Sequence, residues 1–201
     1  MCIRLVFSVL FTVALAKGDS GSIEPRSHSS PVAVFVPHEL FRDDEFDAVV
    51  RILERAKIPV AIVSSDTTAA QGIDGLTIKP EQTLTEINPN DFSALVLVDG
   101  SGIVVYWNDS LLWRVCAEFA AAGRFVVGIE LAPLVFARAG LLKNRTATVY
   151  PDFYCINMLK ENGARHRFED VVVDGCILTA SKAEHTGKVI RLLVNFLTKG
   201  N

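Results

Sequence analysis

Residues 123–133 read GRFVVGIELAP, and this stretch decides how the rest of the chain is interpreted. Residues 125–129 form an apolar run rich in β-branched side chains, which is typical of a buried strand. Residues 132–139 are predicted to form a helix that ends at Gly140, so the strand gives way to a helix within a few residues. We predict that the bend between them lies at the carboxyl edge of a parallel sheet, where open α/β sheets bind their ligands.

Strand and helix patterns alternate on both sides of this stretch. Apolar runs predict strands over residues 32–36, 59–64, 94–98, 125–129, 146–149, 171–173 and 176–179. Helical spacing and glycine stops predict helices over residues 43–57, 110–122, 132–139, 153–162 and 185–197. Residues 76–84 are polar and irregular, and we expect a small hairpin there. Such alternation predicts the α/β class, as a three-layer, flavodoxin-like sandwich with a mostly parallel central sheet flanked by helices.

The composition is that of one globular domain. Half of the 201 residues are hydrophobic, which is enough for a full core. The formal net charge is -3 and no Lys/Arg-rich block occurs, so we expect no nucleic-acid partner. The chain has no Walker loop, no GxGxxG after the first strand and no HExxH, so we predict neither a cofactor nor a metal.

The first residues, MCIRLVFSVLFTVALA, have the pattern of a secretory signal peptide. A basic residue precedes an uncharged run over residues 5–16 that is shorter than the ~20 residues needed to span a bilayer. We expect residues 1–16 to be a signal peptide, 17–31 a flexible leader and 32–201 the domain, with no stable membrane span after cleavage. The expected location is the secretory pathway or the cell exterior, and the alternative is an uncleaved membrane anchor.

The predicted secretion decides how the cysteines and two sequons are interpreted. Cys116, Cys155 and Cys176 remain after cleavage, an odd number without CxxC spacing, which indicates neither a zinc site nor a dense disulfide framework. One bridge with a free thiol, or no bridge, are both open. Asn108 and Asn144 each begin an Asn-X-Ser/Thr sequon and are candidate glycan acceptors.

Four stretches resemble a known family. They are DDEFDAVVRILERAKIPVAIVS (43–64), FSALVLVDG (92–100), GRFVVGIELAPLVFARAGLLKNRTATVYP (123–151) and FEDVVVDGCILTAS (168–181). From about residue 32 to 197 the chain is similar to the ThiJ/PfpI superfamily, which has the class I glutamine amidotransferase-like fold and includes PfpI-type peptidases and the Parkinson-disease-associated protein deglycase. The resemblance implies the sandwich predicted above and a homodimer.

The resemblance also marks a departure at the bend. The superfamily places a nucleophilic cysteine there, and the corresponding residue in this chain is Glu130. The superfamily's acidic partner corresponds to Glu45, so Glu130 and Glu45 are the candidate catalytic pair. The Ser-Arg near the last strand is not kept, because Ser181 is followed by Lys182. Further pocket candidates are Asp99 and Gly100 (the superfamily's Gly-Gly), Leu131, Tyr150, and His38 just after the first strand.

Glu130 admits several functional hypotheses. A glutamate cannot form the thiohemiacetal that a cysteine forms, so the first hypothesis is a catalytically degenerate pseudoenzyme with a binding or assembly role and a small-molecule ligand at the bend. The alternative is an enzyme that acts on a small carbonyl compound, such as a glyoxalase, lyase or hydrolase, with Glu45 and Glu130 sharing a proton. A divalent-cation site with Asp99 or Tyr150, and a fixed mimic of an oxidised cysteine, are further readings of the same substitution.

Overall fold

The computed structural model describes residues 30–199, so the predicted signal peptide and most of the predicted leader lie outside the described residues. Its centre is a seven-stranded sheet in the order β11-β12-β8-β7-β1-β3-β6. Neighbouring strands are parallel except for the antiparallel pair β11 and β12, which confirms the predicted, mostly parallel sheet. The strands are β1 (Val32–Phe35), β3 (Val60–Ser64), β6 (Gln82–Thr83), β7 (Ala94–Leu97), β8 (Phe125–Ile129), β11 (Val171–Asp174) and β12 (Ile177–Ala180).

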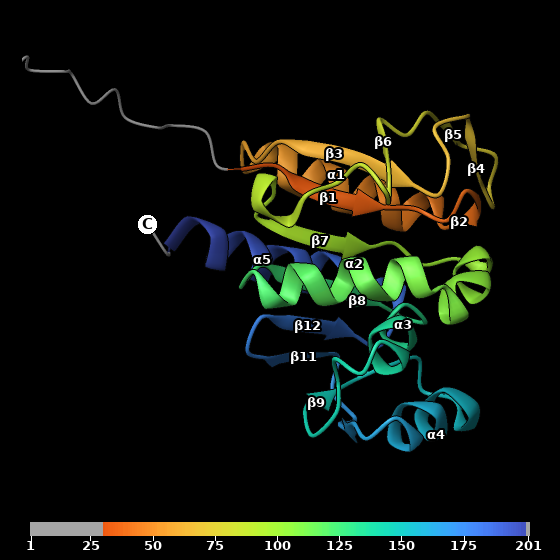
Figure 1. Ribbon diagram of the computed structural model, residues 1–201, viewed down its shortest axis with the longest axis vertical. Coiled ribbons are helices and arrows are strands. Elements are labelled where there is room, and N and C mark those ends of the chain that lie inside the picture. The colour runs from red at the N-terminus through yellow and green to blue at the C-terminus, as the bar shows by residue number, and fades with distance from the viewer. Residues whose placement is uncertain (1–29, 200–201) are drawn as a thin grey trace, which may run out of the picture.

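Helices cover both faces of this sheet, as Figure 1 shows. On one face α1 (Asp43–Arg55) lies against α5 (Thr186–Lys199), and both bury apolar stripes on the sheet. On the other face α2 (Ser110–Ala121) and α3 (Pro133–Arg138) bury a second core. In α1 the buried apolar residues Phe46, Val49 and Leu53 recur at helical spacing, which is why this segment folds as an amphipathic helix. The predicted three-layer sandwich is therefore confirmed.

The structure corrects the prediction of a hairpin over residues 76–84. The hairpin lies earlier, where β4 (Ala70–Gly72) pairs antiparallel with β5 (Thr77–Ile78) in a small sheet that also holds β2 (Glu39–Phe41). Its turn is fixed by the Asp43 carboxylate, which accepts the backbone N–H groups of Asp74 (3.1 Å) and Leu76 (2.7 Å). β6 instead joins the main sheet beside β3. These strands are too short to show a period of their own in the sequence.

Two further segments differ from expectation. Residues 146–149 do not join the main sheet, because only β9 (Thr146–Ala147) is a strand and its partner is β10 (Arg165–His166). The residues after β7 form a 3-10 helix, η2 (Ser101–Asn108), where we expected only a turn. The remaining elements are the 3-10 segments η1 (Pro89–Asp91) and η3 (Ala183–His185) and the helix α4 (Phe153–Glu161).

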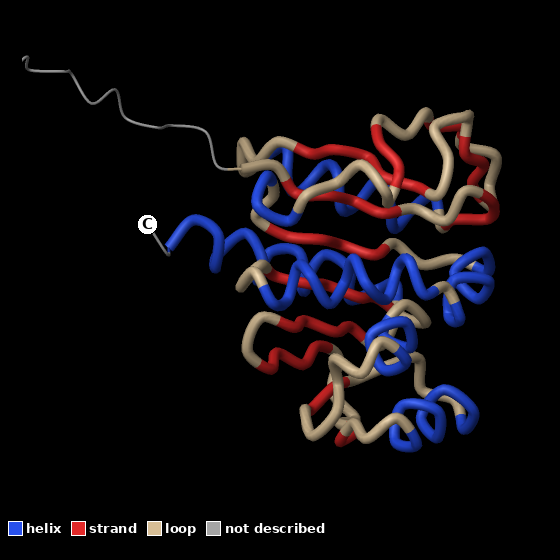
Figure 2. Tube along the Cα trace, viewed as in Figure 1, coloured by secondary structure: helices blue, strands red, loops and turns tan. Residues whose placement is uncertain are grey.

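The elements bring several loops to one edge of the main sheet (Figure 2). The carboxyl ends of β7, β8 and β12 meet there, beside the start of α1. The Arg42 backbone N–H donates to the Asp99 carbonyl at 2.8 Å, which joins the β2–α1 connection to the end of β7. Gly100 has φ +134°, and a Cβ there would collide with the Leu40 carbonyl, so only glycine allows this approach. Within residues 30–199, none of the helices combines the length and apolarity that crossing a membrane requires.

Candidate functional site

Glu130 occupies the bend between β8 and α3 in a strained backbone conformation. Its φ is +55°, a left-handed value that costs a non-glycine residue about 1–2 kcal/mol. Neighbouring segments hold the bend in place: the Glu130 N–H donates to the Ala180 carbonyl (2.9 Å), and the Tyr150 N–H donates to the Glu130 carbonyl (2.8 Å). Strain that the surroundings enforce in this way is typical of functional sites.

Three carboxyl groups from different elements gather behind this bend: Glu130, Asp99 at the end of β7, and Glu45 in the first turn of α1. Glu45 and Asp99 are 1% and 2% exposed, whereas the Glu130 side chain is 14% exposed. The Asp99 backbone N–H donates to Glu45 Oε1 at 2.6 Å. The Asp99 carboxyl is hydrogen-bonded to the Glu130 carboxyl. Only Glu130 therefore links the buried acids to the surface.

Burial holds protons on the inner acids. It raises the pKa of Asp99 from 3.8 to about 8, and the nearby charge of Glu130 raises it further against opposing hydrogen bonds from the Gly100 and Leu131 backbone. Burial, followed by the charge of Asp99, also raises the pKa of Glu45 well above its usual value. Near neutral pH Asp99 is thus a neutral acid beside the Glu130 carboxyl group.

Arg42 brings a cation next to Glu130. Its guanidinium Nη1 lies 3.6 Å from Glu130 Oε2, and its Nε donates to the Asp44 carboxylate at 3.0 Å. Sequence reasoning missed Arg42, because it stands just outside the four family-like stretches and looks like an ordinary surface residue. Its position three residues before Glu45, at the start of α1, was the only available signal.

A cavity of about 300 Å³ opens over Glu130. Its lining comprises Arg42, Glu130, Tyr150, Lys182, Ala183 and Glu184. Of the pocket candidates from the sequence, Tyr150 lines this cavity; Asp99 and Gly100 are buried, and Leu131 is absent from the lining. Glu45, the other half of the candidate catalytic pair, also lies behind the cavity rather than in it.

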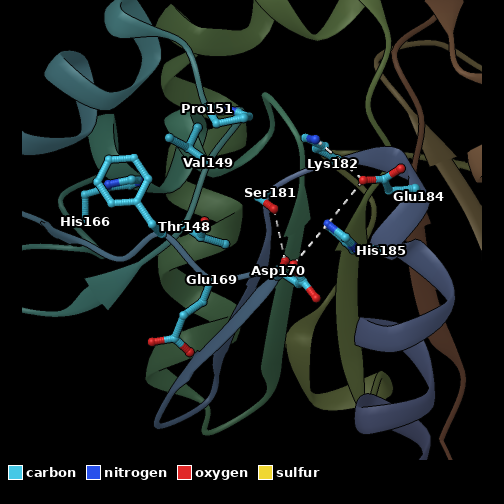
Figure 3. Close-up of a pocket in the computed structure, with 11 residues that line it drawn as sticks. Thr148, Val149, Pro151, His166, Glu169, Asp170, Ser181, Lys182, Glu184 and His185 are labelled. Carbon is cyan, nitrogen blue, oxygen red and sulfur yellow. Dashed lines mark hydrogen bonds and ion pairs between the residues drawn. The ribbon is translucent and has the colours of Figure 1, made fainter.

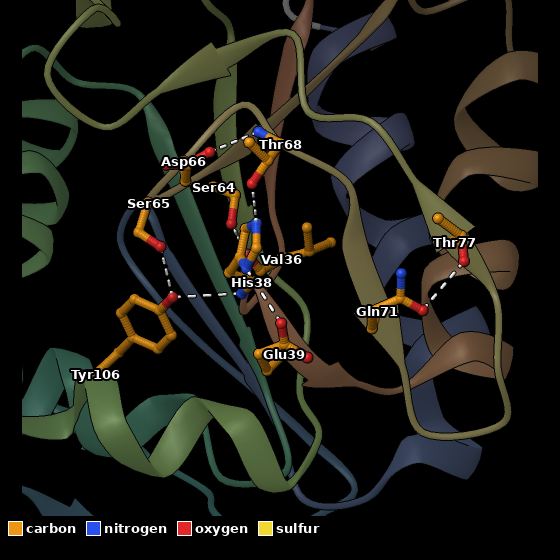
Figure 4. Close-up of polar contacts among 10 residues, drawn as sticks. All are labelled: Val36, His38, Glu39, Ser64, Ser65, Asp66, Thr68, Gln71, Thr77 and Tyr106. Atoms are coloured by element: carbon orange, nitrogen blue, oxygen red, sulfur yellow. Dashed lines mark hydrogen bonds and ion pairs between the residues drawn. The ribbon is translucent and has the colours of Figure 1, made fainter.

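His38 lies apart from this cavity, in a polar network near η2 (Figure 4). Its Nε2 is 3.0 Å from the Thr68 hydroxyl, and its backbone N–H donates to the Tyr106 hydroxyl at 3.3 Å. The Tyr106 hydroxyl also lies 2.9 Å from that of Ser65. The structure therefore separates His38 from Glu130, although both follow parallel strands.

No described cysteine provides a thiolate at the bend. Cys116 is fully buried in α2, and burial raises the pKa of its thiol. Cys155 is 1% exposed at the start of α4, and burial raises the pKa of its thiol to about 12. Cys176 is partly buried beside the β11–β12 turn, and all three thiols are free. Across residues 30–199, no group of three or more His, Cys, Asp or Glu side chains is placed to hold a metal ion.

Comparison with known proteins shows a family match and related sequences. The DJ-1/PfpI family matches residues 30–195 of the chain. An uncharacterized protein of Methanocaldococcus jannaschii is 34% identical over 182 residues, covering 88% of this chain and 89% of that protein. A deglycase of Pyrococcus horikoshii is 26% identical over 142 residues, covering 71% of this chain and 84% of the relative.

Solved structures agree on the fold. A ThiJ/PfpI domain protein from Brachyspira murdochii superimposes with a TM-score of 0.81 at 23% identity, covering 86% of this chain and 98% of the other. Drosophila melanogaster DJ-1beta superimposes with a TM-score of 0.73 at 22% identity, covering 84% and 90%. At this level of identity the likeness extends to the fold alone.

Proposed function

The chain belongs to the DJ-1/PfpI family, and we propose that it is a ligand-binding member that works without a thiol nucleophile. One observation carries the proposal: the bend after β8 presents the Glu130 carboxylate to a cavity of about 300 Å³, with the Asp99 acid hydrogen-bonded behind it. This arrangement replaces a nucleophile by a fixed hydrogen-bond acceptor.

The chemistry of the site favours binding over covalent catalysis. A carboxylate attacks a carbonyl carbon poorly, and both buried cysteines have raised thiol pKa values, which disfavour the reactive thiolate. Arg42 supplies a cation within 3.6 Å of Glu130, so the cavity floor offers both charge signs to a ligand. Charge-assisted hydrogen bonds of this kind orient a small polar molecule strongly.

Methylglyoxal consumption by the purified full chain tests this proposal. Wild type and Glu130→Ala should both leave methylglyoxal at the level of buffer, since neither has a cysteine at the bend. Glu130→Cys is the matched variant, because it puts a thiol at the same strained bend. Consumption by wild type that clearly exceeds that of Glu130→Ala would contradict the proposal.

A second candidate function is acid–base catalysis on a small carbonyl compound. It is favoured by the Asp99 pKa of about 8 beside Glu130, because a group that titrates near neutral pH can both give and take a proton. In this version the proton partner of Glu130 is Asp99, because the charge of Glu130 is, after burial, the largest cause of the raised Asp99 pKa, whereas it contributes less to that of Glu45. Wild-type turnover that disappears in both Asp99→Asn and Glu130→Gln would select this candidate.

A further inference from the structure

A second cavity of about 240 Å³ adjoins the cavity over Glu130. Lys182 and Glu184 line both, so the two cavities meet at these side chains. Figure 3 shows Lys182 and Glu184 on one side of the second cavity and His166 on the other. Each cavity alone lies at or below the small end of ligand sites, which run from about 300 to 1,000 Å³, so a ligand of ordinary size has to reach across the Lys182–Glu184 boundary into both. We call the joined cavities the double groove.

The Glu130 end of the double groove carries balanced charge. Two cations pair with two carboxylates there: Arg42 Nη1 lies 3.6 Å from Glu130 Oε2, and Lys182 Nζ lies 3.5 Å from Glu184 Oε1. The side chains of Arg42 and Lys182 are 40% and 47% exposed, so both can be reached from solvent. The acid behind Glu130, Asp99, stays protonated near neutral pH and adds no charge. Such an end is complementary to a ligand that carries an ammonium and a carboxylate together.

The far end of the double groove offers apolar surface. Val149, Pro151 and Phe168 line it, and Phe168 is 83% exposed, with its ring edge-on to His166 at a centroid distance of 4.5 Å. Asp170 and His185 at this end pair with each other at 3.4 Å, and Asp170 also accepts from Lys188 Nζ at 2.9 Å, whereas Glu169, which lines the same cavity, has no ion-pair partner among residues 30–199. The apolar area of Val149, Pro151 and Phe168 beside these groups favours an apolar group of the ligand.

We propose that the double groove binds a free α-amino acid with an aromatic or large aliphatic side chain. The ammonium group lies at the Glu130 and Glu184 carboxylates, and the α-carboxylate at Arg42 and Lys182. The side chain extends over the Lys182–Glu184 boundary onto Phe168. This inference rests on the proposed ligand-binding function and names the ligand class of that same site.

Calorimetric titration of the full chain tests the ligand class with four probes. L-phenylalanine carries all three groups, phenethylamine lacks the carboxylate, 3-phenylpropionate lacks the ammonium, and glycine lacks the side chain. We expect L-phenylalanine to bind at least about tenfold more tightly than each of the others, since each lost group removes a charge pair or an apolar contact. Equal binding of any truncated probe, or no binding of L-phenylalanine, overturns the proposal.

Substitutions locate the binding within the groove. Phe168→Ala should weaken L-phenylalanine binding about tenfold and leave glycine binding unchanged, because only the side-chain contact is lost. Phe153→Ala is the matched control: Phe153 is also 83% exposed, but it lines a different cavity beside α4, so L-phenylalanine binding should not change. Loss of binding in both variants, or in neither, contradicts the assigned groove.

The outcome separates this inference from the function on which it rests. If L-phenylalanine fails to bind and methylglyoxal is not consumed, the proposed ligand class is wrong. The proposed function, ligand binding without a thiol nucleophile, is not contradicted by that result. If wild type consumes methylglyoxal above the level of Glu130→Ala, the proposed function is wrong, whatever the titration shows.

Discussion

The neutral Asp99 acid should make the folded chain less stable as the pH rises. Its pKa is raised from 3.8 to about 8 by folding, so between these values the folded chain keeps a proton that the unfolded chain loses. The unfolded state is then favoured by about 1.4 kcal/mol for each pH unit. Between the two pKa values the free energy of unfolding falls by at most about 6 kcal/mol. The decrease ends near pH 8, where Asp99 also ionises in the folded chain.

Asp99→Asn removes this decrease in the free energy of unfolding, because an amide has nearly the size of the acid and cannot ionise. At pH 7 the variant should be more stable than wild type, with an upper limit of about 4 kcal/mol, and at pH 4 the difference should nearly vanish. The raised pKa of Glu45 acts in the same direction, so part of the pH dependence should persist in the variant.

Urea unfolding followed by circular dichroism between pH 4 and pH 8 measures these free energies. Asp91→Asn is the control, because Asp91 is an exposed aspartate at the end of η1 and its substitution should leave the pH dependence of wild type unchanged. If Asp99→Asn is no more stable than wild type at pH 7, and loses stability with pH just as steeply, the assignment of a protonated buried Asp99 is refuted.

Three other outcomes follow from named contacts. Glu130→Gly should be about 1–2 kcal/mol more stable than Glu130→Ala in urea unfolding, because glycine adopts φ +55° without strain; equal stability would argue against the strained bend. Asp174→Ala should destabilise by about 1–3 kcal/mol, since Asp174 accepts from the Thr146 N–H (2.7 Å) and hydroxyl (3.0 Å). These bonds lower the Asp174 pKa, so its contribution is present at neutral pH and disappears as the pH falls through that lowered value; a wild type and variant of equal melting temperature at pH 7 would count against it. Finally, the exposed Asn108 and Asn144 should carry glycans when the chain is secreted from eukaryotic cells, so N-glycosidase should reduce its mass; a secreted product with an intact residue 1 and no mass change would contradict the predicted processing.

The sequence predicts the fold well because each main-sheet strand except β6 is an apolar run with turn residues at its ends. The run at residues 125–129 is an example: it is buried between two helical layers, so nearly every position must be apolar. Residues 82–83 are polar and pair only at the sheet edge, where hydropathy carries no signal. Their place depends on register with β3, which only the folded chain defines.

The candidate site is harder to predict from the sequence than the fold. Glu130 and Glu45 are found through the resemblance to the ThiJ/PfpI superfamily, as the residues at the positions of its cysteine and its acidic partner. The pairing of Glu130 with Asp99, rather than with Glu45, depends on which buried acid lies nearest in space. The cationic side of the site was found only in part: Lys182 stands at the superfamily's Ser-Arg position, but Arg42 resembles an ordinary surface charge until the sheet edge brings both beside Glu130.

A carboxyl ¹³C NMR titration of the full chain tests the central claim most directly, namely that the bend of this fold holds a carboxylate backed by a protonated acid. We expect one aspartate resonance to titrate near pH 8 and to be missing from Asp99→Asn, with the Glu130 resonance shifting at the same step. If every aspartate carboxyl in the wild type has ionised by pH 5, no neutral acid stands behind Glu130 and the account of this site is wrong.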